Sequence, residues 1–132
     1  MIKGINILQV LGGPQQGKIG SQLIAKLINY QKPINLSGFS STTWDISIGY
    51  NANLLMDTNK TLILRNLTPG DYGTLKIIQD SVGSRTLTLP TNSIVMGTQG
   101  GSTLVLSTNA NTIDIATFYF DGVKLFWNLS KY

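Results

Sequence analysis

The residues best placed to do chemistry are Asp80 and Arg85, which stand at the two ends of a short glycine-containing turn. A carboxylate and a guanidinium at that spacing could together bind a sugar or a cation. They could also form an exposed ion pair or a turn hydrogen bond that fixes a hairpin, because Asp suits turn geometry. Exposed pairs contribute only about 0–1 kcal/mol to stability. We therefore interpret Asp80 and Arg85 as a structural turn pair.

The sequence lacks most of the side chain types that enzymes use for catalysis. The 132 residues include no Cys and no His, and all six acidic residues are Asp. Thiolate metal sites and disulfides are excluded, and no imidazole is present to activate a Ser or Thr hydroxyl. The Asp residues are scattered along the chain rather than clustered as in a calcium loop. We expect no catalytic residue, no metal and no cofactor, so the protein is not expected to be an enzyme.

Two glycine-rich segments, residues 12–18 and 97–102, superficially resemble phosphate-binding loops. Neither has the Gly-Lys-Ser/Thr ending, and neither clearly leads from a strand into a helix that could face a phosphate. No nucleotide site is expected. Trp44 and Trp127 could stack on sugars, but such aromatic residues more often belong to a core.

Positive charge is concentrated near the N-terminus. Residues 1–32 carry four Lys and no acid, whereas the six other basic residues are balanced by six Asp. A basic segment can bind nucleic acid, but docking onto an acidic protein surface explains spaced lysines equally well. No stretch approaches the ~20 apolar residues of a membrane span, and residues 5–11 are too short and polar for a signal peptide. We expect a protein made inside the cell, with neither nucleic acid nor membrane as a partner.

The chain divides into an N-terminal region, residues 1–40, and a second region, residues 41–132. Residues 1–10 alternate loosely and could form a short strand, and residues 12–17 are expected to be a loop. Residues 36–43 are rich in Ser, Thr and Gly and are predicted to be a linker. Between these segments apolar residues recur at helical spacing until Pro33 ends the helix; they are Ile19, Leu23, Ile24, Leu27 and Ile28.

From Trp44 onward the hydrophobic pattern has a period of two, which is typical of strands. Strands are expected at residues 44–48, 54–56, 61–67, 72–79, 85–89, 103–106, 112–120 and 123–129, with glycine-rich turns between them. Short, evenly spaced strands favour an antiparallel β-sandwich or jelly roll. We therefore expect a mainly β fold, with a short N-terminal anchor that contains one helix.

The dipeptide Asp121-Gly122 favours a two-residue type I′ turn between the last two strands. That turn would pair Phe120 with Val123 and place Trp127 on a wholly apolar, buried face. The opposite face is also rich in apolar residues, although a sheet in a monomeric sandwich needs only one buried face. Either a partner or covering loops would explain it. The candidate oligomer interface residues are Ile115, Tyr119 and Phe126.

These segments resemble a β-module that is common in virion proteins of tailed bacteriophages. The resemblance rests on Trp44-Asp45, on the pattern Gln-Asp…Gly-x-Arg-x-Leu-x-x-Pro in residues 79–90, and on Tyr119-Phe120-Asp121-Gly122. It covers roughly residues 43–132. Such modules occur in head fibres, tail fibres and baseplate-associated spikes. The resemblance implies a homotrimeric, jelly-roll-like sandwich without catalysis.

The place of the basic, partly helical segment is similar to that of an N-terminal fibre anchor. The resemblance therefore implies a structural virion protein, either a head fibre or a capsid decoration protein, held by other virion proteins. Charge would speed the encounter and an apolar face would retain it; the expected anchor residues are Lys18, Leu23, Ile24, Lys26 and Leu27. The alternative is a tail-fibre module for host attachment that binds surface carbohydrate. A depolymerase based on Asp is disfavoured by the missing Glu, His and Cys.

Overall fold

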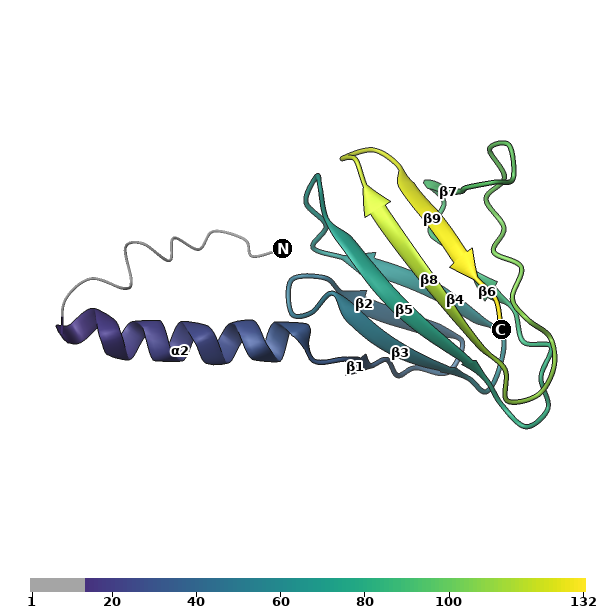
Figure 1. The fold of residues 1–132 in the computed structure, drawn as a ribbon. Helices are drawn as coiled ribbons and strands as arrows, with labels where there is room; N and C mark the ends of the chain where they lie inside the picture. The colour runs from purple at the N-terminus through teal and green to yellow at the C-terminus, as the bar shows by residue number, and fades with distance from the viewer. Residues whose placement is uncertain (1–13) are drawn as a thin grey trace.

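The fold is a β-sandwich with one helix at its N-terminal side (Figure 1). It comes from a computed structural model that describes the backbone of residues 14–132 and the side chains of residues 23–132. The mainly β fold with a single N-terminal helix, expected from the sequence, is confirmed within these residues. The strand predicted for residues 1–10 lies outside them.

The two sheets differ in size. The larger has six strands in the order β1 (Ile34–Asn35), β3 (Asn51–Met56), β5 (Tyr72–Gln79), β8 (Ile113–Phe120), β9 (Leu125–Ser130) and β7 (Ser93–Val95). The smaller has three strands in the order β2 (Ser41–Asp45), β4 (Lys60–Arg65) and β6 (Leu87–Thr88). The helix α2 (Pro14–Gln31) precedes them all. The strands β1 and β7 were not predicted, because two or three residues are too few for an alternating pattern.

Successive strands from β1 to β6 alternate between the two sheets, so that each connection crosses from one sheet to the other. Within the larger sheet β1, β3 and β5 are parallel, and within the smaller sheet β2, β4 and β6 are parallel. The pairs β5–β8 and β8–β9 are antiparallel. The expected antiparallel sandwich is thus corrected to a mixed one. A hairpin turn places two consecutive strands side by side and antiparallel. Here consecutive strands lie in different sheets, so the neighbours within one sheet are every second strand of the chain, and these run in the same direction.

The core lies between the sheets and is centred on two tryptophans. Trp44 and Trp127 are both fully buried, and their rings pack against Phe118 at centroid distances of 5.5 and 5.2 Å. Each indole N–H is satisfied, since Trp44 Nε1 donates to Gly49 O at 2.9 Å and Trp127 Nε1 donates to Ser93 Oγ at 3.0 Å. The interpretation of both tryptophans as core residues is confirmed, which removes them as sugar-stacking candidates.

The β8–β9 hairpin has a longer loop than the predicted two-residue turn. Phe120 pairs with Leu125, two positions beyond the expected partner Val123. A type I′ turn needs positive φ at both central residues, but here φ is positive at Gly122 and not at Asp121. Instead Asp121 Oδ1 accepts hydrogen bonds from the N–H groups of Val123 and Lys124 at 2.8 and 2.7 Å. A shift of two keeps every side chain on its predicted face.

The boundaries around the N-terminal region also differ from the prediction. The helix begins at Pro14, inside the expected loop, because Pro is well suited to the first turn of a helix. The predicted linker is part of the sandwich. The strand β1 pairs with β3 just before it, β2 begins within it at Ser41 and pairs with β4, and Lys60 Nζ donates to Gly38 O and Phe39 O at 2.6 and 2.8 Å. The β body therefore starts at Ile34, ahead of the boundary expected after residue 40.

Another difference concerns the strands predicted for residues 85–89 and 103–106. Residues 85–89 contribute only the short strand β6, and residues 103–106 contribute a single bridge, from Leu104 to Leu87. The short strand β6 forms one edge of the smaller sheet through its pairing with β4, and residues 103–106 run beside that edge without forming a continuous ladder. They border the cleft described below.

Candidate functional site

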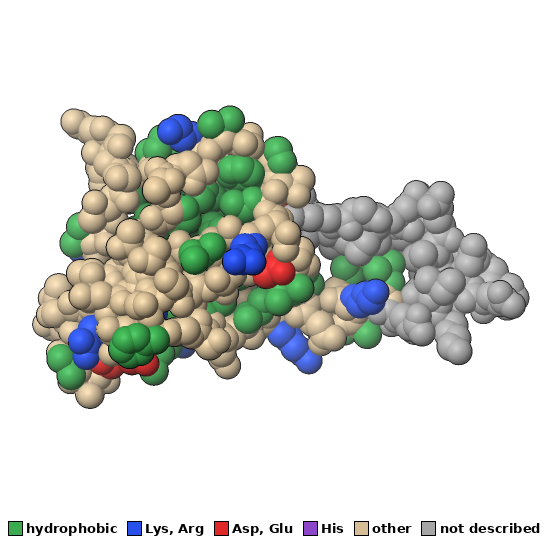
Figure 2. Space-filling model, turned by 180° about the vertical axis from the view of Figure 1, so that it is seen from behind, with side chains coloured by type: hydrophobic (Ala, Val, Ile, Leu, Met, Phe, Trp, Pro, Cys, Tyr) green, Lys and Arg blue, Asp and Glu red, His purple; other side chains and the backbone are tan. Residues whose placement is uncertain are grey.

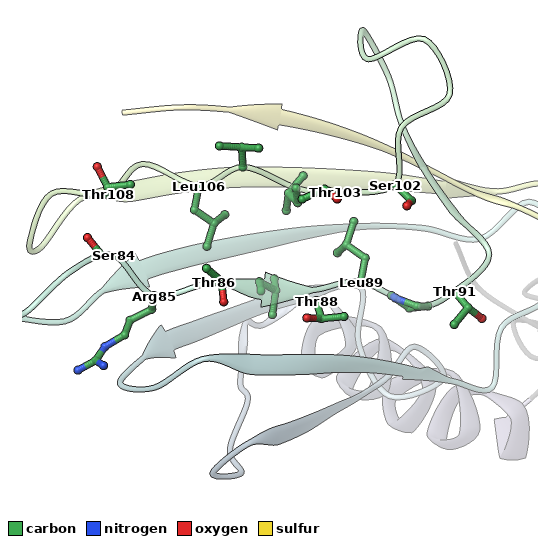
Figure 3. Close-up of a pocket in the computed structure, with 14 residues that line it drawn as sticks. Ser84, Arg85, Thr86, Thr88, Leu89, Thr91, Ser102, Thr103, Leu106 and Thr108 are labelled. Atoms are coloured by element: carbon green, nitrogen blue, oxygen red, sulfur yellow. The ribbon is translucent and has the colours of Figure 1, made fainter.

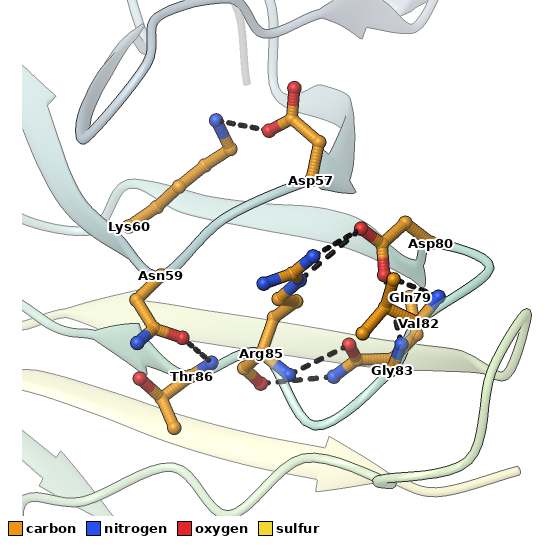
Figure 4. A network of polar contacts seen from close by, with 9 residues as sticks. All are labelled: Asp57, Asn59, Lys60, Gln79, Asp80, Val82, Gly83, Arg85 and Thr86. Carbon is orange, nitrogen blue, oxygen red and sulfur yellow. Dashed lines mark hydrogen bonds and ion pairs between the residues drawn. The ribbon is translucent and has the colours of Figure 1, made fainter.

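Asp80 and Arg85 lie in the connection between β5 and β6, which crosses from one sheet to the other (Figure 4). The expected ion pair forms: Arg85 Nε and Nη2 donate to Asp80 Oδ2 at 3.2 and 2.9 Å. Asp80 Oδ1 accepts from the N–H groups of Val82 and Gly83 at 3.1 and 2.9 Å. The hydrogen bond from Arg85, followed by that from Gly83, lowers the pKa of the Asp80 carboxyl. The turn is an arch between sheets, so the expected hairpin is wrong.

Two further residues fix this arch. The Gln79 amide is buried, and it exchanges hydrogen bonds with both the N–H and the C=O of Arg85, each at 3.0 Å. Gly83 has a φ of +80°, and a Cβ atom there would lie 2.4 Å from Thr108 O. Both Asp80 oxygens and the Arg85 head group are thus engaged within the arch. The arrangement positions the backbone, and it offers a ligand little unused hydrogen-bonding capacity.

A cleft of about 540 Å³ lies beside the arch, between residues 84–91 and 102–108 (Figure 3). Leu106 from one segment and Leu89 from the other point into it at different places along its length, and seven Ser and Thr residues contribute to its lining. Its one charged lining residue, Arg85, is held by Asp80. The lining contains no acid, amide or aromatic side chain, so the cleft lacks the convergent polar groups of a specific small-molecule site.

The outward face of the larger sheet carries a row of aromatic and apolar side chains. We use the name outward face for the side chains of this sheet that point away from the core. Tyr72 of β5 pairs with Tyr119 of β8, which pairs with Phe126 of β9, which pairs with Ile94 of β7. Tyr72 and Tyr119 are 48 % and 52 % exposed. Four hydrophobic side chains from four strands therefore form one continuous row, partly open to solvent.

A second apolar row lies at the other end of the outward face, and polar rows separate the two. The second row consists of Leu55, Ile78 and Ile113 on three adjacent strands. Between the two hydrophobic rows lie a neutral polar row and a mixed row; the first is Asn51, Thr74, Thr117 and Asn128, and the second is Asn53, Lys76, Ile115 and Ser130. The outward face is thus largely uncharged, with Lys76 as the charged residue of these rows.

The structure places all three predicted interface residues on the outward face. Tyr119 and Phe126 are direct cross-strand partners, whereas Ile115 lies four residues away along β8 and is 37 % exposed. Sequence reasoning missed Tyr72, which extends the aromatic row onto β5. Its outward position follows from the alternation within β5, but its place beside Tyr119 depends on the pairing of β5 with β8.

An aromatic cluster joins the end of α2 to the larger sheet. The Tyr30 ring lies 5.0 Å from that of Tyr50, which lies 5.8 Å from that of Tyr72. The Tyr30 hydroxyl donates to Ile46 O at 3.0 Å, and Asn51 Nδ2 donates to Gln31 O at 2.9 Å. Burial, assisted by the negative charge of nearby Asp71, raises the pKa of Tyr30. The C-terminal turn of the helix is therefore attached to the sandwich by several contacts.

The predicted anchor residues lie along the part of α2 that projects from the sandwich (Figure 1). Ile24 is 54 % exposed, Lys26 is also exposed, and Leu23 and Leu27 are half-buried. Figure 2 shows hydrophobic and basic side chains exposed together on the helix. Lys18 lies outside the residues whose side chains the structure describes.

Clusters of metal-ligating side chains and long apolar helices are both absent from the described part of the chain. No group of three or more acidic side chains is close enough there to hold a metal ion. Among the same residues, no helix combines the length and hydrophobicity needed to cross a membrane. No family model, curated protein or solved structure matches the chain.

Proposed function

We propose that this chain is a structural virion protein of a tailed bacteriophage, a homotrimeric head fibre or capsid decoration protein attached through its N-terminal segment. The observation that carries the proposal is the outward face of the larger sheet. The other face of this sheet already packs in the core, yet the outward face carries hydrophobic rows as well. A second hydrophobic face contributes nothing to the core of a single chain, and large exposed patches of this kind mark interaction sites. The resemblance of residues 43–132 to phage virion modules supports the virion as the place of assembly.

The outward face is large enough for a stable interface between copies. The six strands are spaced ~4.8 Å apart, have two to eight residues each that rise ~3.3 Å, and together span an area on the order of 500 Å². Specific interfaces bury at least about 500 Å² on each partner. Aromatic side chains are enriched at the centres of such interfaces and charged ones are depleted, which agrees with the Tyr72 and Tyr119 row.

The N-terminal segment supplies attachment in this proposal. The first acidic residue of the chain is Asp45, so the segment before it carries four Lys and no opposing charge. Such a segment is attracted to an acidic surface on the capsid or on another virion protein. The sandwich would then project from the attachment point.

Light scattering on the full-length protein tests the oligomeric state. We expect a mass three times that of the 14.3 kDa chain. Phe126→Asp should dissociate the trimer, because it places a charge in a desolvated row. Val123→Asp is the matched control, since Val123 is apolar and 69 % exposed but lies in the β8–β9 loop outside the strands. A monomeric wild-type protein would contradict the proposal.

Imaging of assembled virions tests the location and the polarity. Particles that carry the double variant Lys18→Glu and Lys26→Glu should show reduced occupancy of this protein, because the charge that attracts the segment is reversed. Labelling at the head is expected. Labelling at the tail tip instead would favour the alternative function below.

Carbohydrate binding during host attachment is the second candidate, and the aromatic row favours it. Tyr72 and Tyr119 lie beside a neutral polar row that includes Asn51 and Asn128. Exposed rings next to amides and hydroxyls are the groups that bind sugars, which have apolar faces and many hydroxyls. Glycan-array binding that Tyr119→Ala abolishes, without a change in the mass from light scattering, would support this function. A trimer that buries Tyr119 excludes it at this face.

A further inference from the structure

The helix α2 has an apolar side and a polar side. With 3.6 residues per turn, each residue turns the helix by ~100°. Four aliphatic residues fall within one arc of about 140° on this geometry; they are Leu23, Ile24, Leu27 and Ile28. Lys26 and Asn29 lie on the opposite side and are exposed. Helices with such a stripe normally turn it toward a core.

The described part of the sandwich does not cover this apolar stripe. Ile24 and Ile28 are 54 % and 52 % exposed, and none of the described strands packs extensively along α2. The contacts that hold the helix come from Tyr30 and Gln31 in its last turn. Figure 1 shows the remainder of α2 running away from the sheets.

The helix also lacks the local features that stabilise an isolated helix. Its 18 residues include Gly17 and Gly20, which lower helix propensity. It has no acidic residue in its first turn and no basic residue in its last, so neither end is matched to the helix dipole. Because it contains no Asp or Glu, ion pairs between successive turns are absent as well. Even alanine-rich helices need about 12–15 residues to be stable alone in water, and most helices in proteins are stabilised by packing of an amphipathic face. Because α2 is only slightly longer and has a poorer composition, its stability depends on packing of its apolar stripe.

We propose that the apolar stripe of α2 packs against α2 of two further copies of this chain, forming a three-helix bundle along the trimer axis. This inference rests on the proposed homotrimer. Association of the sandwiches holds the helices at an effective concentration on the order of millimolar, which favours pairing of short helices. The stripe is wider than the narrow seam of a two-stranded coiled coil, so each helix can contact two neighbours.

The bundle explains the charge distribution of the segment as well. With the aliphatic residues inside, Lys26 of each copy faces outward. The bundle is then a basic projection that suits an acidic partner. The contacts between copies are made by Leu23, Ile24 and Leu27, which therefore do not bind the virion directly. Charge and hydrophobicity on α2 therefore serve two different contacts.

Cysteine cross-linking in the full-length protein tests the bundle. The chain contains no Cys, so Ile24→Cys introduces a single thiol in the apolar stripe. Mild oxidation by diamide should join the introduced thiols of two copies as a disulfide, while the diamide takes up the two electrons and two protons. Asn29→Cys, on the polar side, is the matched control and should cross-link at least tenfold more slowly. Dimers are scored on a non-reducing gel.

The outcomes separate failure of the bundle from failure of the trimer. Light scattering that gives a trimer mass, together with equal cross-linking rates for the two variants, would overturn the bundle and leave the trimer standing. A monomer mass would overturn both. Sedimentation with phosphatidylglycerol vesicles tests a lipid surface as the partner of the stripe. Binding to the vesicles that Ile24→Asp abolishes would assign the stripe to a lipid surface and overturn the bundle.

A second variant checks folding independently of cross-linking. The double change Ile24→Asp and Ile28→Asp should reduce the helical signal in circular dichroism while the β signal and the trimer mass remain. A full helical signal in this variant would show that α2 is stable without its apolar stripe, which contradicts the proposal.

Discussion

The side-chain amide of Gln79 pairs with the backbone of Arg85 as a neighbouring strand would. Gln79 Oε1 accepts from Arg85 N, and Gln79 Nε2 donates to Arg85 O, both at 3.0 Å. Nε2 also donates to Ser107 O at 3.1 Å. The pairing occurs where the chain leaves β5 for the other sheet, so one buried side chain replaces the ladder hydrogen bonds that the crossing interrupts.

Gln79→Leu should therefore lower the free energy of unfolding by about 2–4 kcal/mol, because buried backbone groups that lose their partners cost about 1–3 kcal/mol each. Urea unfolding followed by fluorescence measures the change. Thr88→Val, at an exposed position of β6, is the control and should stay within about 0.5 kcal/mol of wild type. A loss as small as the control's would show that the pairing is incidental.

Two glycines with the same backbone angle should respond differently to Ala. Gly83 and Gly97 have φ of +80° and +81°, so both substitutions carry the cost of a left-handed backbone, about 1–2 kcal/mol. At Gly97 an added Cβ meets nothing within 4 Å, whereas at Gly83 it lies 2.4 Å from Thr108 O. Gly83→Ala should cost about 1–3 kcal/mol more than Gly97→Ala, since the clash is with backbone. Equal denaturation midpoints would contradict the close approach.

Lys60 should hold the segment between β1 and β2 in place. Its side chain is buried, and Nζ donates to Gly38 O and Phe39 O and pairs with Asp57 Oδ1 at 2.8 Å. Lys60→Met should destabilise the protein by about 2–4 kcal/mol, because two carbonyls lose a charged donor. It should also speed chymotrypsin cleavage after Phe39, which is 79 % exposed. Asp57→Asn, which leaves both carbonyl contacts intact, should have a smaller effect on both readouts.

Stability should fall in acid because three turn carboxyls have lowered pKa values. Hydrogen bonding lowers the pKa of Asp57 through Lys60, of Asp80 through Arg85 and of Asp121 through the Lys124 N–H. Each contribution is complete above the ordinary Asp pKa of about 3.9. It is lost as the pH falls through the lower pKa of the folded state, since the unfolded chain takes up protons first. Thermal melting between pH 7 and pH 2 should show this decrease.

Asp80→Asn separates one part of that acid effect. The amide oxygen can still accept from Val82 and Gly83, but the ion pair with Arg85 is lost. The variant should melt lower than wild type at pH 7 and approach it at pH 2. A constant difference across the range would show that the Asp80 charge does not contribute.

The candidate interface was partly predictable. Tyr119 and Phe126 were placed on one face because alternation within each strand of the final hairpin is a local property. The two-residue error in the β8–β9 register did not change that face, since side chains repeat every two residues. Tyr72 could not be placed beside Tyr119, because its own alternation says nothing about which strand lies next to β5.

The sequence by itself determined the class of the fold, the extent of β5, the burial of Trp44 and Trp127, and the amphipathic helix before Pro33. Each depends on interactions among residues close in the chain or on the simple exclusion of apolar groups from water. Only the tertiary structure decided that β1, β3 and β5 are parallel and that the linker belongs to the sandwich. Strand partners are chosen by contacts between distant segments, and a period-two pattern is the same whichever neighbour a strand has.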